Sequence, residues 1–397
     1  LGVYDDSGAL HYAGRVGSGF SDHDLDELQR LLTPLTRNGS PFVPGPIGPP
    51  RSATFTQPEL VVEVEFREWT KDGALRAPAY KALRTDKRPR DVKRESPHDT
   101  QEARDDRPRR LTNQDKVLYP AVGLTKRQVI DYYSAVAPVL LRHLRDRPLT
   151  VKRYPDGVDG KAFFQKSSPS HRPAWVRTVG VPSERRAVID YTVVDDLETL
   201  VWVANLAALE LHVPLALASD LARPGAVVFD LDPGPPATIV ECCRVALLLQ
   251  GTFEQLGLES FAKTSGSKGL QVYVPLGGDS SYPQTKRFSS SLAQLVERAQ
   301  PDLVVSRMTR ALRDGKVLID WSQNDPHKTT VCVYSLRATQ RPTVSTPVGW
   351  DEVRATLDSG DPGSLSFEYD AVLERVARAG DLFAPVLALQ QALPQAS

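Results

Sequence analysis

The sequence has few cysteines, the residues whose disulfides stabilise many exported proteins, and it has no long run of apolar residues. Its 397 residues include only three cysteines, Cys242, Cys243 and Cys332, which have neither the spacing of a zinc site nor the number that a disulfide framework needs. This scarcity indicates a reducing cytosol. No signal peptide and no stretch of about 18 apolar residues is present, so we expect no membrane-spanning helix.

Net charge is also absent, because 49 Lys and Arg residues balance 49 Asp and Glu residues. The composition as a whole therefore gives no argument for binding nucleic acid. Positive charge is local instead, since residues 104–153 contain twelve Lys or Arg against five Asp or Glu. Such a run can present a basic face to a phosphate backbone, although a charge run is more often a solvated surface.

Composition divides the chain into two domains. Residues 94–110 contain almost no apolar side chain and cannot bury enough surface to become ordered, so we expect a flexible tether there. We expect a β-rich domain over residues 1–93, with one helix that Ser21 caps, and a mixed domain over residues 111–397. The chain begins at Leu1 in what reads as the middle of a domain, which indicates a piece of a longer protein.

Apolar periodicity predicts the elements of the second domain. Helices are expected over Thr125–Leu144, Leu197–Leu211, Ala237–Leu256 and residues 284–299. Strands are expected over Leu149–Arg153, Ala162–Lys166, the apolar run that ends at Asp232, and residues 316–320. This mixture predicts an α/β two-layer core with a small sheet.

Two aspartates mark the most informative segment. Asp230 and Asp232 stand at the end of an apolar run and just before the turn Pro233-Gly234. Alternation along a strand places both carboxylates on one face at the strand tip, with Leu231 on the other face. Two such carboxylates repel unless a cation lies between them, and hard divalent metals prefer oxygen ligands. A solvated turn is the alternative, because Asp-Pro-Gly is common turn chemistry.

Two further segments strengthen the metal hypothesis. The short apolar strand Lys316–Trp321 carries a third carboxylate, Asp320. The segment Lys263–Pro275 reads as a Gly-rich loop that runs into a strand, and its hydroxyls, Lys268 and backbone N–H groups suit phosphate oxygens. Three carboxylates and a phosphate-binding loop are what metal-assisted nucleotidyl transfer requires.

These three segments together resemble a known family. Phe229–Gly234, Thr264–Leu270 and Val317–Asn324 are similar to the three motifs of the polymerase domain of bacterial ligase D, in the archaeo-eukaryotic primase superfamily. The similarity extends from Leu111 to Phe383. It implies an α/β (α+β) primase-polymerase core with an RRM-like catalytic sheet.

The N-terminal domain resembles a different family. Tyr12–Phe20, Glu63–Trp69 and Leu83–Lys87 are similar to the C-terminal OB-fold, a small β-barrel, of ATP-dependent DNA ligases of the ligase D type. The resemblance implies that Arg84 and Lys87, in the last ligase motif, contact ATP phosphates. The adenylation domain that precedes this barrel in the family has no counterpart in the sequence, so we expect no ligase activity from this chain alone.

The polymerase resemblance also assigns roles to individual residues. It implies that Asp230, Asp232 and Asp320 are catalytic and hold two Mn²⁺ or Mg²⁺ ions. The nucleotide-binding residues that it implies are His212, Ser265, Lys268, Gln271, Arg313, Arg337 and Lys152. The DNA-binding residues that it implies are Lys116 and Lys126, at a downstream 5′-phosphate, and Phe163 or Phe164, stacked on a template base.

Structural roles are the alternative for several of these residues. A single histidine such as His212 is more often structural than ligand-binding, and Phe163 and Phe164 point to opposite faces of a strand. Gln271 departs from the family, which usually has histidine at this position. Glutamine keeps hydrogen bonding but cannot become a cation, so we expect weaker triphosphate binding or altered pH dependence rather than an inactive site.

Together these features predict a template-directed nucleotidyltransferase that fills gaps and processes ends in bacterial non-homologous end joining. Its expected substrates are NTPs or dNTPs. Its expected partners are double-stranded DNA ends and gaps with a 5′-phosphate, and a Ku-like end-binding protein. The expected location is the bacterial cytoplasm, at the nucleoid. The alternative is a DNA-end-binding scaffold of the same repair complex in which the change at Gln271 has impaired catalysis.

Overall fold

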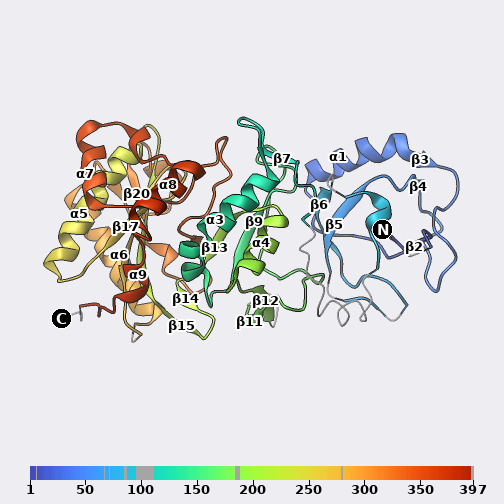
Figure 1. Cartoon of the computed structure of the whole chain (residues 1–397), viewed down its shortest axis with the longest axis horizontal. Helices are drawn as coiled ribbons and strands as arrows, with labels where there is room; N and C mark the ends of the chain where they lie inside the picture. The colour runs from blue at the N-terminus through green and yellow to red at the C-terminus, as the bar shows by residue number, and fades with distance from the viewer. Residues whose placement is uncertain are drawn as a thin grey trace. The chain divides into compact units, whose positions relative to one another are not determined.

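The computed structural model describes residues 1–5, 7–66, 68–70, 72–84, 87–94, 111–183, 188–278 and 280–394. These residues belong to two compact units, whose elements are labelled in Figure 1. The first unit comprises residues 1–116, 154–163 and 169–175, and the second comprises residues 117–153, 164–168 and 176–397. The predicted tether lies, from residue 95 onward, outside the described residues, so the predicted domain limits at 93 and 111 stay predictions.

The first unit contains short strands and one longer helix. Its elements are β1 (Gly2–Tyr4), β2 (Leu10–Tyr12), α1 (Asp22–Leu32), η1 (Thr33–Leu35), β3 (Thr36–Arg37), β4 (Phe55–Thr56), β5 (Val61–Glu65), β6 (Ala79–Arg84) and η2 (Pro89–Asp91). The predicted cap of α1 is confirmed, because the Ser21 side chain accepts the N–H of Asp24 while the Asp24 carboxylate accepts the N–H of Ser21. In the described part of this unit the strands form three two-stranded sheets, and none closes into a barrel.

The second unit is built on two sheets. The four-stranded sheet has the order β10–β9–β13–β21, and the six-stranded sheet has the order β19–β20–β16–β18–β17–β22. The strands of the first are β10 (Phe163–Gln165), β9 (Thr150–Arg153), β13 (Ala208–Val213) and β21 (Thr330–Val331). The strands of the second are β19 (Val304–Val305), β20 (Val317–Asp320), β16 (Ala226–Pro233), β18 (Leu270–Pro275), β17 (Phe261–Thr264) and β22 (Pro347–Val348). Three two-stranded ribbons complete the described strands: β7 (Val117–Tyr119) with β8 (Leu124–Thr125), β11 (Thr178–Pro182) with β12 (Val188–Thr192), and β14 (Ala216–Leu217) with β15 (Asp220–Pro224).

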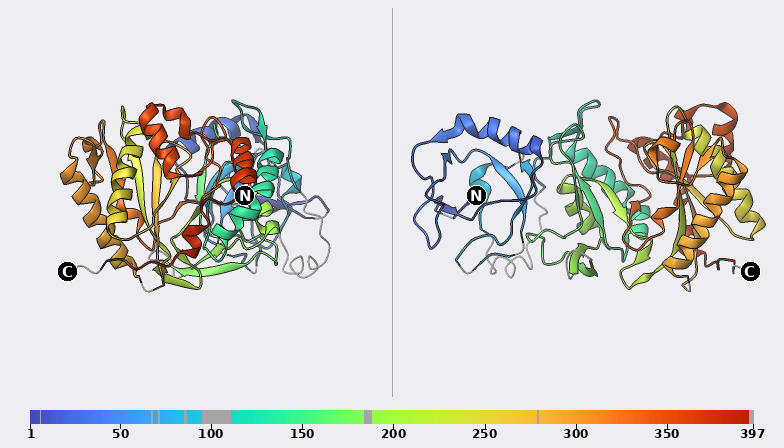
Figure 2. Two further views of the ribbon diagram at one scale, coloured as in Figure 1. Left: turned by 60° about the vertical axis from the view of Figure 1, so that its left-hand side comes forward. Right: turned by 180° about the vertical axis from the view of Figure 1, so that it is seen from behind.

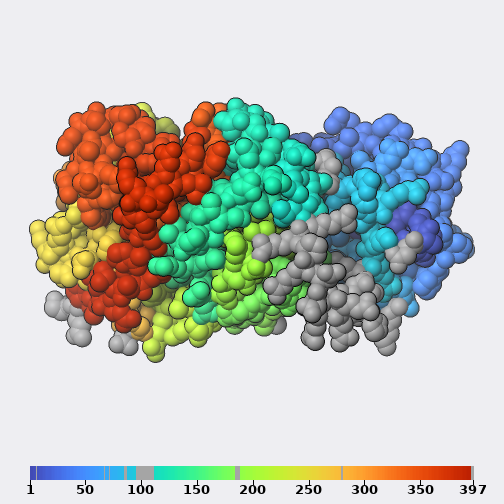
Figure 3. Space-filling model, in the orientation of Figure 1, coloured from blue at the N-terminus to red at the C-terminus, as the bar shows by residue number. Residues whose placement is uncertain are grey.

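Helices pack around both sheets. They are α3 (Lys126–Leu144), α4 (Leu197–Asn205), α5 (Ile239–Gln255), α6 (Tyr282–Ala299), α7 (Trp350–Ser359), α8 (Tyr369–Ala379) and α9 (Pro385–Ala388), with single turns η3 (Arg310–Leu312), η4 (Trp321–Gln323) and η5 (Pro362–Leu365). Figure 2 shows α5 and α6 along one face of the six-stranded sheet. The distant segments α3 and α8 lie side by side (Figure 3), with the ring of Tyr132 against that of Tyr369. No described helix is long and apolar enough to cross a bilayer.

The six-stranded sheet has one apolar face and one polar face. Phe229 and Leu231 on β16 are fully buried in the cluster formed with α5, α6 and α7. Asp230, which lies between them in sequence, points to the opposite face, beside Gln271 of β18 and Asp320 of β20. The mixed α/β class is therefore confirmed, and the predicted placement of the two aspartates on one strand face is found.

One predicted helix is wrong in its second half. The apolar segment Leu197–Leu211 was expected to be one helix, but α4 ends at Asn205 and Ala207 has a positive φ of 57°. The chain then enters β13, which is paired on both sides and buried. The apolar residues 206–209 run from the end of the helix into the strand, so periodicity did not separate the two elements. His212 therefore lies on a strand.

The predicted Gly-rich loop is also shorter than expected. Lys263 and Thr264 belong to β17, so the loop comprises only residues 265–269. Lys263 is 1% exposed, and its ammonium group donates to the carbonyl of Val331 at 3.1 Å and to Oγ of Ser345 at 2.7 Å. Burial lowers the pKa of Lys263 to about 7, against the opposing charge of Asp230. Lys263 thus links the two sheets and is not part of the loop.

Candidate active site

Strand pairing brings the three predicted carboxylates to neighbouring positions. Asp230 is paired in register with Asp320 on one side and with Gln271 on the other. Asp232 lies two residues further along β16, where the strand ends at Pro233. The site is therefore at the open tip of the central strand, on the polar face of the six-stranded sheet.

Close backbone contacts hold this tip in place. A Cβ atom on Gly269 would lie 1.9 Å from the carbonyl oxygen of Leu231, and one on Gly234 would lie 1.9 Å from the carbonyl oxygen of Arg313. Only glycine permits either approach. The glycines of the first two motifs thus pack the Gly-rich loop and the Arg313 segment against the strand that carries the aspartates.

Asn324 anchors the third motif to the same strand. Its side chain is fully buried, accepts the N–H of Val228 at 2.9 Å and donates to the carbonyl of Val228 at 2.7 Å. The amide thereby continues the ladder of β16 beyond the end of β20. This fixes the turn after Asp320 relative to Asp230.

The carboxylates raise one another's proton affinity. Burial, and then repulsion by Asp232 and Asp320, raise the pKa of Asp230 to about 7, although a hydrogen bond from Gln271 and the charge of Lys263 oppose the shift. Partial burial of the carboxyl and the charge of Asp320 also raise the pKa of Asp232. A divalent cation would relieve this repulsion, so the donor set fits a hard metal.

The third carboxylate is hydrogen-bonded to the turn that follows it. Asp320 accepts hydrogen bonds from the N–H and Oγ of Ser322, at 3.0 and 2.6 Å, and from Nε2 of Gln323 at 2.9 Å. Accordingly, no three His, Cys, Asp or Glu side chains in the described part of the chain are grouped to hold a metal ion as they stand. Asp230 and Asp232 form the available pair, and Asp320 would have to exchange these partners to join them.

Three predicted cations surround the pair. Lys268, Arg313 and Arg337 all act on the carboxylate of Asp232 and lower its pKa against the shifts described above. Arg313 donates through Nη2 to the carbonyl of Met308 at 2.6 Å, and Arg337 donates through Nη1 to the carbonyl of Ser265 at 2.6 Å. Among the described residues, Nε of Arg313 is buried with no hydrogen-bond partner, and the buried Nε of Arg337 has only the carboxylate of Glu210 near it, at 3.5 Å. Buried donors of this kind suit a bound anion.

The loop between β17 and β18 is braced by its own serine. Oγ of Ser265 accepts the N–H groups of Ser267 and Gly269, at 3.3 and 3.1 Å, and the N–H of Ser265 donates to the carbonyl of Gly269 at 2.8 Å. Ser265 is buried, whereas Lys268 is exposed at the loop tip. Lys268 is thus open to solvent, while Ser265 sets the shape of the loop.

Gln271 faces Asp230 and is closed off from solvent. Its side chain is 2% exposed, it is paired across the strands with Asp230, and its hydrogen bond acts to lower the pKa of that carboxyl. The predicted contact of Gln271 with triphosphate or sugar is therefore not available in this arrangement, because the side chain is buried beneath Asp230.

His212 belongs to a buried ionic group that the sequence did not indicate. Its Nε2 lies 2.9 Å from Oε2 of Glu210, and Oε1 of Glu210 lies 3.5 Å from Nε of Arg337. Burial acts to raise the pKa of Glu210, but the bond to His212 and the charge of Arg337 outweigh it and hold the value at about 2. Burial lowers the pKa of His212 against the effect of Glu210. The group joins β13 to the arginine beside Asp232.

An aromatic side chain lies next to this group. Phe164 is 57% exposed, its ring meets that of His212 edge-on at 5.6 Å, and Nζ of Lys152 lies 5.4 Å from its centroid. Phe163 is only partly exposed. Of the two phenylalanines, Phe164 therefore presents the open ring that stacking on a base requires.

Three of the other predicted binding residues are engaged within the protein. Lys116 forms an ion pair with Asp156 at 2.8 Å, and the side chain of Lys126, the first residue of α3, is only 4% exposed. In the first unit, Nη1 of Arg84 lies 2.5 Å from Oε2 of Glu63, and Lys87 is exposed. A phosphate at either place would have to compete with these carboxylates or with the packing around Lys126.

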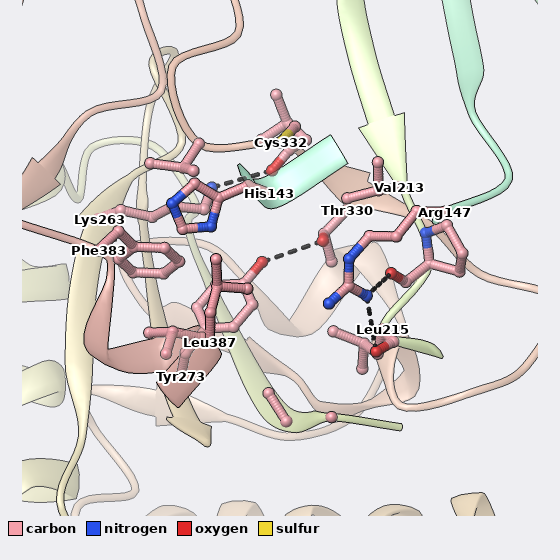
Figure 4. Close-up of a pocket in the computed structure, with 16 residues that line it drawn as sticks. His143, Arg147, Val213, Leu215, Lys263, Tyr273, Thr330, Cys332, Phe383 and Leu387 are labelled. Carbon is pink, nitrogen blue, oxygen red and sulfur yellow. Dashed lines mark hydrogen bonds between the residues drawn. The ribbon is translucent and has the colours of Figure 1, made fainter. Parts of the chain in front are cut away.

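A small cavity lies behind the site, between the two sheets. Its volume is about 50 Å³, and Lys263, Tyr273, Thr330 and Arg147 are among the side chains that line it (Figure 4). Nη1 of Arg147 donates to the carbonyls of Pro214 and Leu215 at 2.9 and 2.8 Å. The hydroxyl of Tyr273 connects this cavity to Gln271, at 3.3 Å.

Sequence reasoning missed Glu210, Lys263 and Tyr273. Glu210 and His212 alternate on one strand face, which is a usable signal once the segment is recognised as a strand. Lys263 and Tyr273 contact residues about sixty positions or more away in sequence, and no local pattern reports such contacts.

Comparison with known proteins agrees with both resemblances. The profile of the LigD primase-polymerase domain matches residues 125–383, and that of the C-terminal region of ATP-dependent DNA ligases matches residues 1–87. The solved polymerase domain of Mycobacterium tuberculosis ligase D in complex with DNA is 40% identical, with a TM-score of 0.66, and the alignment covers 72% of this chain and 100% of that one.

Two curated relatives define the extent of the similarity. The multifunctional non-homologous end joining protein LigD of Mycolicibacterium smegmatis is 43% identical over 279 residues, which cover 70% of this chain and 36% of that protein. Its namesake in Pseudomonas aeruginosa is 30% identical over 377 residues, which cover 89% of this chain and 44% of that protein. The chain thus spans less than half the length of these relatives. With the profile match over residues 125–383 and the fold that surrounds the three motifs, the chain belongs to the LigD primase-polymerase family.

Proposed function

We propose that this chain catalyses template-directed nucleotidyl transfer at DNA gaps and ends, as a polymerase module of bacterial non-homologous end joining. The observation that carries the proposal is the tip of β16, where three cations act on Asp232 and one of them, Arg313, has a buried Nε donor with no hydrogen-bond partner among the described residues. A nucleoside triphosphate, whether NTP or dNTP, supplies an anion for such a donor.

The carboxylates and cations divide the work of the reaction. Asp230 and Asp232, joined by Asp320, would hold two divalent cations, Mn²⁺ or Mg²⁺, which supply positive charge at the reacting phosphate and activate the primer 3′-hydroxyl. Lys268, Arg313 and Arg337 would bind the oxygens of the triphosphate. With the triphosphate held there, the α-phosphate is presented to the 3′-hydroxyl and pyrophosphate leaves.

Other residues would hold the nucleic acid. Phe164 would stack on a template base, with Lys152 and His212 beside it near the incoming nucleotide. Lys116 and Lys126 would contact the 5′-phosphate of the downstream strand. We further infer that residues 1–93 form an OB-type domain, in line with the ligase match, that a Ku-like protein is a partner, and that the chain alone does not seal nicks.

A gap-filling assay tests the proposal. The substrate is a duplex with a one-nucleotide gap and a downstream 5′-phosphate, and the chain is supplied with Mn²⁺ and each NTP or dNTP in turn. We expect addition of the nucleotide that is complementary to the template base, and no addition in excess EDTA. Tight binding of the gapped duplex with no addition under any metal would instead support a scaffold whose catalysis is impaired.

A further inference from the structure

A chain of buried side chains runs from the cavity to Asp230. Gln271 is paired across the strands with Asp230, and Oε1 of Gln271 accepts a hydrogen bond from the hydroxyl of Tyr273 at 3.3 Å. The Tyr273 hydroxyl is also hydrogen-bonded to Oγ1 of Thr330 at 3.0 Å, as Figure 4 shows. Gln271, Tyr273 and Thr330 are all buried, at 2%, 6% and 5% exposure.

Ionisation of Asp230, which a metal ligand requires, sets the direction of these bonds. An ionised carboxylate accepts but does not donate, so Gln271 then presents its NH₂ group to Asp230 and its oxygen to Tyr273. The Tyr273 hydroxyl has a single proton, which it donates in the hydrogen bond to Gln271. The Thr330 hydroxyl is then the donor to Tyr273, and each group in the chain donates toward Asp230.

We propose that Tyr273 is a positioning residue for the metal site, because it fixes which end of the Gln271 amide faces Asp230. The oxygen and nitrogen of an amide are nearly equal in shape, so packing alone selects neither orientation. Without the Tyr273 hydroxyl, Gln271 can turn its oxygen toward Asp230, where two acceptors repel each other. The ionised carboxylate that a metal needs then loses its donor.

The surroundings of Tyr273 are suited to this role. The ring of Phe383 packs edge-on against the Tyr273 ring at 5.2 Å and 83°, and Nζ of Lys263 lies 5.7 Å from the ring centroid. Thr330 is on β21, which is paired with the strand that carries His212. The orientation of Gln271 is therefore tied to the four-stranded sheet as well as to its own strand.

Mn²⁺ binding to the intact chain tests this role, which rests on the proposed metal-dependent function. Free Mn²⁺ is measured by its electron paramagnetic resonance signal, at fixed pH and without nucleotide. Tyr273→Phe keeps the ring and removes the hydroxyl, and we expect about tenfold weaker Mn²⁺ binding, at the low end of the range for residues that orient metal ligands. Thr330→Val, which leaves Tyr273 in place, should weaken binding in the same direction but less.

The matched control removes another buried tyrosine hydroxyl. Tyr132 is 2% exposed, and its hydroxyl donates to the backbone carbonyl of Tyr334 at 2.8 Å. Tyr132→Phe should therefore cost a similar hydrogen bond while leaving Mn²⁺ affinity unchanged. A loss of Mn²⁺ affinity in this control equal to that of Tyr273→Phe would show a general structural effect and overturn the proposal.

A double-mutant cycle shows whether Tyr273 acts through Gln271. In Gln271→Met there is no amide to orient, so adding Tyr273→Phe should change Mn²⁺ affinity less than about twofold. An equal loss in both backgrounds, or no loss in the wild-type background, would overturn the positioning role. If the wild-type chain itself binds no Mn²⁺, the proposed function fails, and the two failures are thereby distinguished.

Discussion

At the residue scale, the surroundings of Asp230 are unfavourable to its ionised carboxylate. Its carboxyl is partly buried, faces Asp320 across the strand pair and shares a strand face with Asp232. A folded state that raises the pKa of a carboxyl is destabilised by ionising it. Such a cost at a strand tip is typical of a functional site, where a ligand removes it.

Replacing Asp230 with asparagine should therefore stabilise the metal-free protein at high pH. The pKa of Asp230 is raised from 3.8 to about 7 on folding, so its ionisation costs stability progressively from about pH 4 and fully above about pH 7. Asp230→Asn should raise the thermal midpoint at pH 8 by a few degrees, for a gain on the order of 1 kcal/mol, and the gain should shrink toward pH 4.

Thermal unfolding in excess EDTA, followed from pH 4 to pH 8, measures this gain. Asp358→Asn is the control, because Asp358 is exposed on α7, and this substitution should leave the midpoint unchanged. A gain for Asp230→Asn that is constant across this pH range would contradict the role of ionisation.

At the element scale, the site depends on how closely the Gly-rich loop approaches β16. Gly269→Ala places a methyl group 1.9 Å from the carbonyl oxygen of Leu231, which is backbone and cannot rotate away. We expect a loss of about 1–3 kcal/mol in the free energy of unfolding, because the strands must separate. Chemical denaturation followed by circular dichroism measures it.

Gly251 provides the matched control for this substitution. It lies within α5, and a Cβ atom there would meet nothing within 4 Å. Gly251→Ala should stabilise the helix by about 0.5–1 kcal/mol, since alanine is the better helix former. Equal effects of the two substitutions would show that the contact with Leu231 is not tight.

Elements with local signals could be predicted from the sequence. The helix predicted from Thr125 begins at Lys126 with Thr125 as its cap, and the aspartates lie together because strand alternation is a local rule. The division of Leu197–Leu211 into α4 and β13 was not predicted, because the apolar residues 206–209 continue from the helix into the strand. The partners of Gln271 and Asp320 could not be predicted either, because side-chain hydrogen bonds depend on tertiary contacts.

At the scale of the whole molecule, the expected choice of DNA ends depends on Lys116 and Lys126. If these lysines bind a 5′-phosphate, removing that phosphate from the downstream strand should weaken DNA binding about tenfold, since charge-assisted hydrogen bonds contribute about 1.5–3 kcal/mol. Because Lys116 also pairs with Asp156, we expect the loss of DNA affinity to be at the lower end of the range that these bond energies give. Lys116→Ala with Lys126→Ala should erase the preference for phosphorylated ends.

Affinity for phosphorylated and unphosphorylated gaps, at one salt concentration, measures the preference. The alternative is that both lysines belong to a general basic face. In that case the double variant would bind both substrates more weakly by the same factor. Nucleotide addition on saturating DNA should be unaffected in either case.

The central claim, that Asp230 and Asp232 carry metal-dependent nucleotidyl transfer, is tested most directly by measuring nucleotide addition and DNA affinity together in Asp232→Ala. Asp232 is at the strand tip, and its carboxylate accepts no hydrogen bond from the described residues. The Asp232→Ala variant should therefore fold. We predict that single-nucleotide addition to a gapped duplex with Mn²⁺ falls by at least about a thousandfold, while the affinity for the same duplex changes less than about threefold. Retained addition, or a loss of DNA affinity in proportion to activity, would contradict the account.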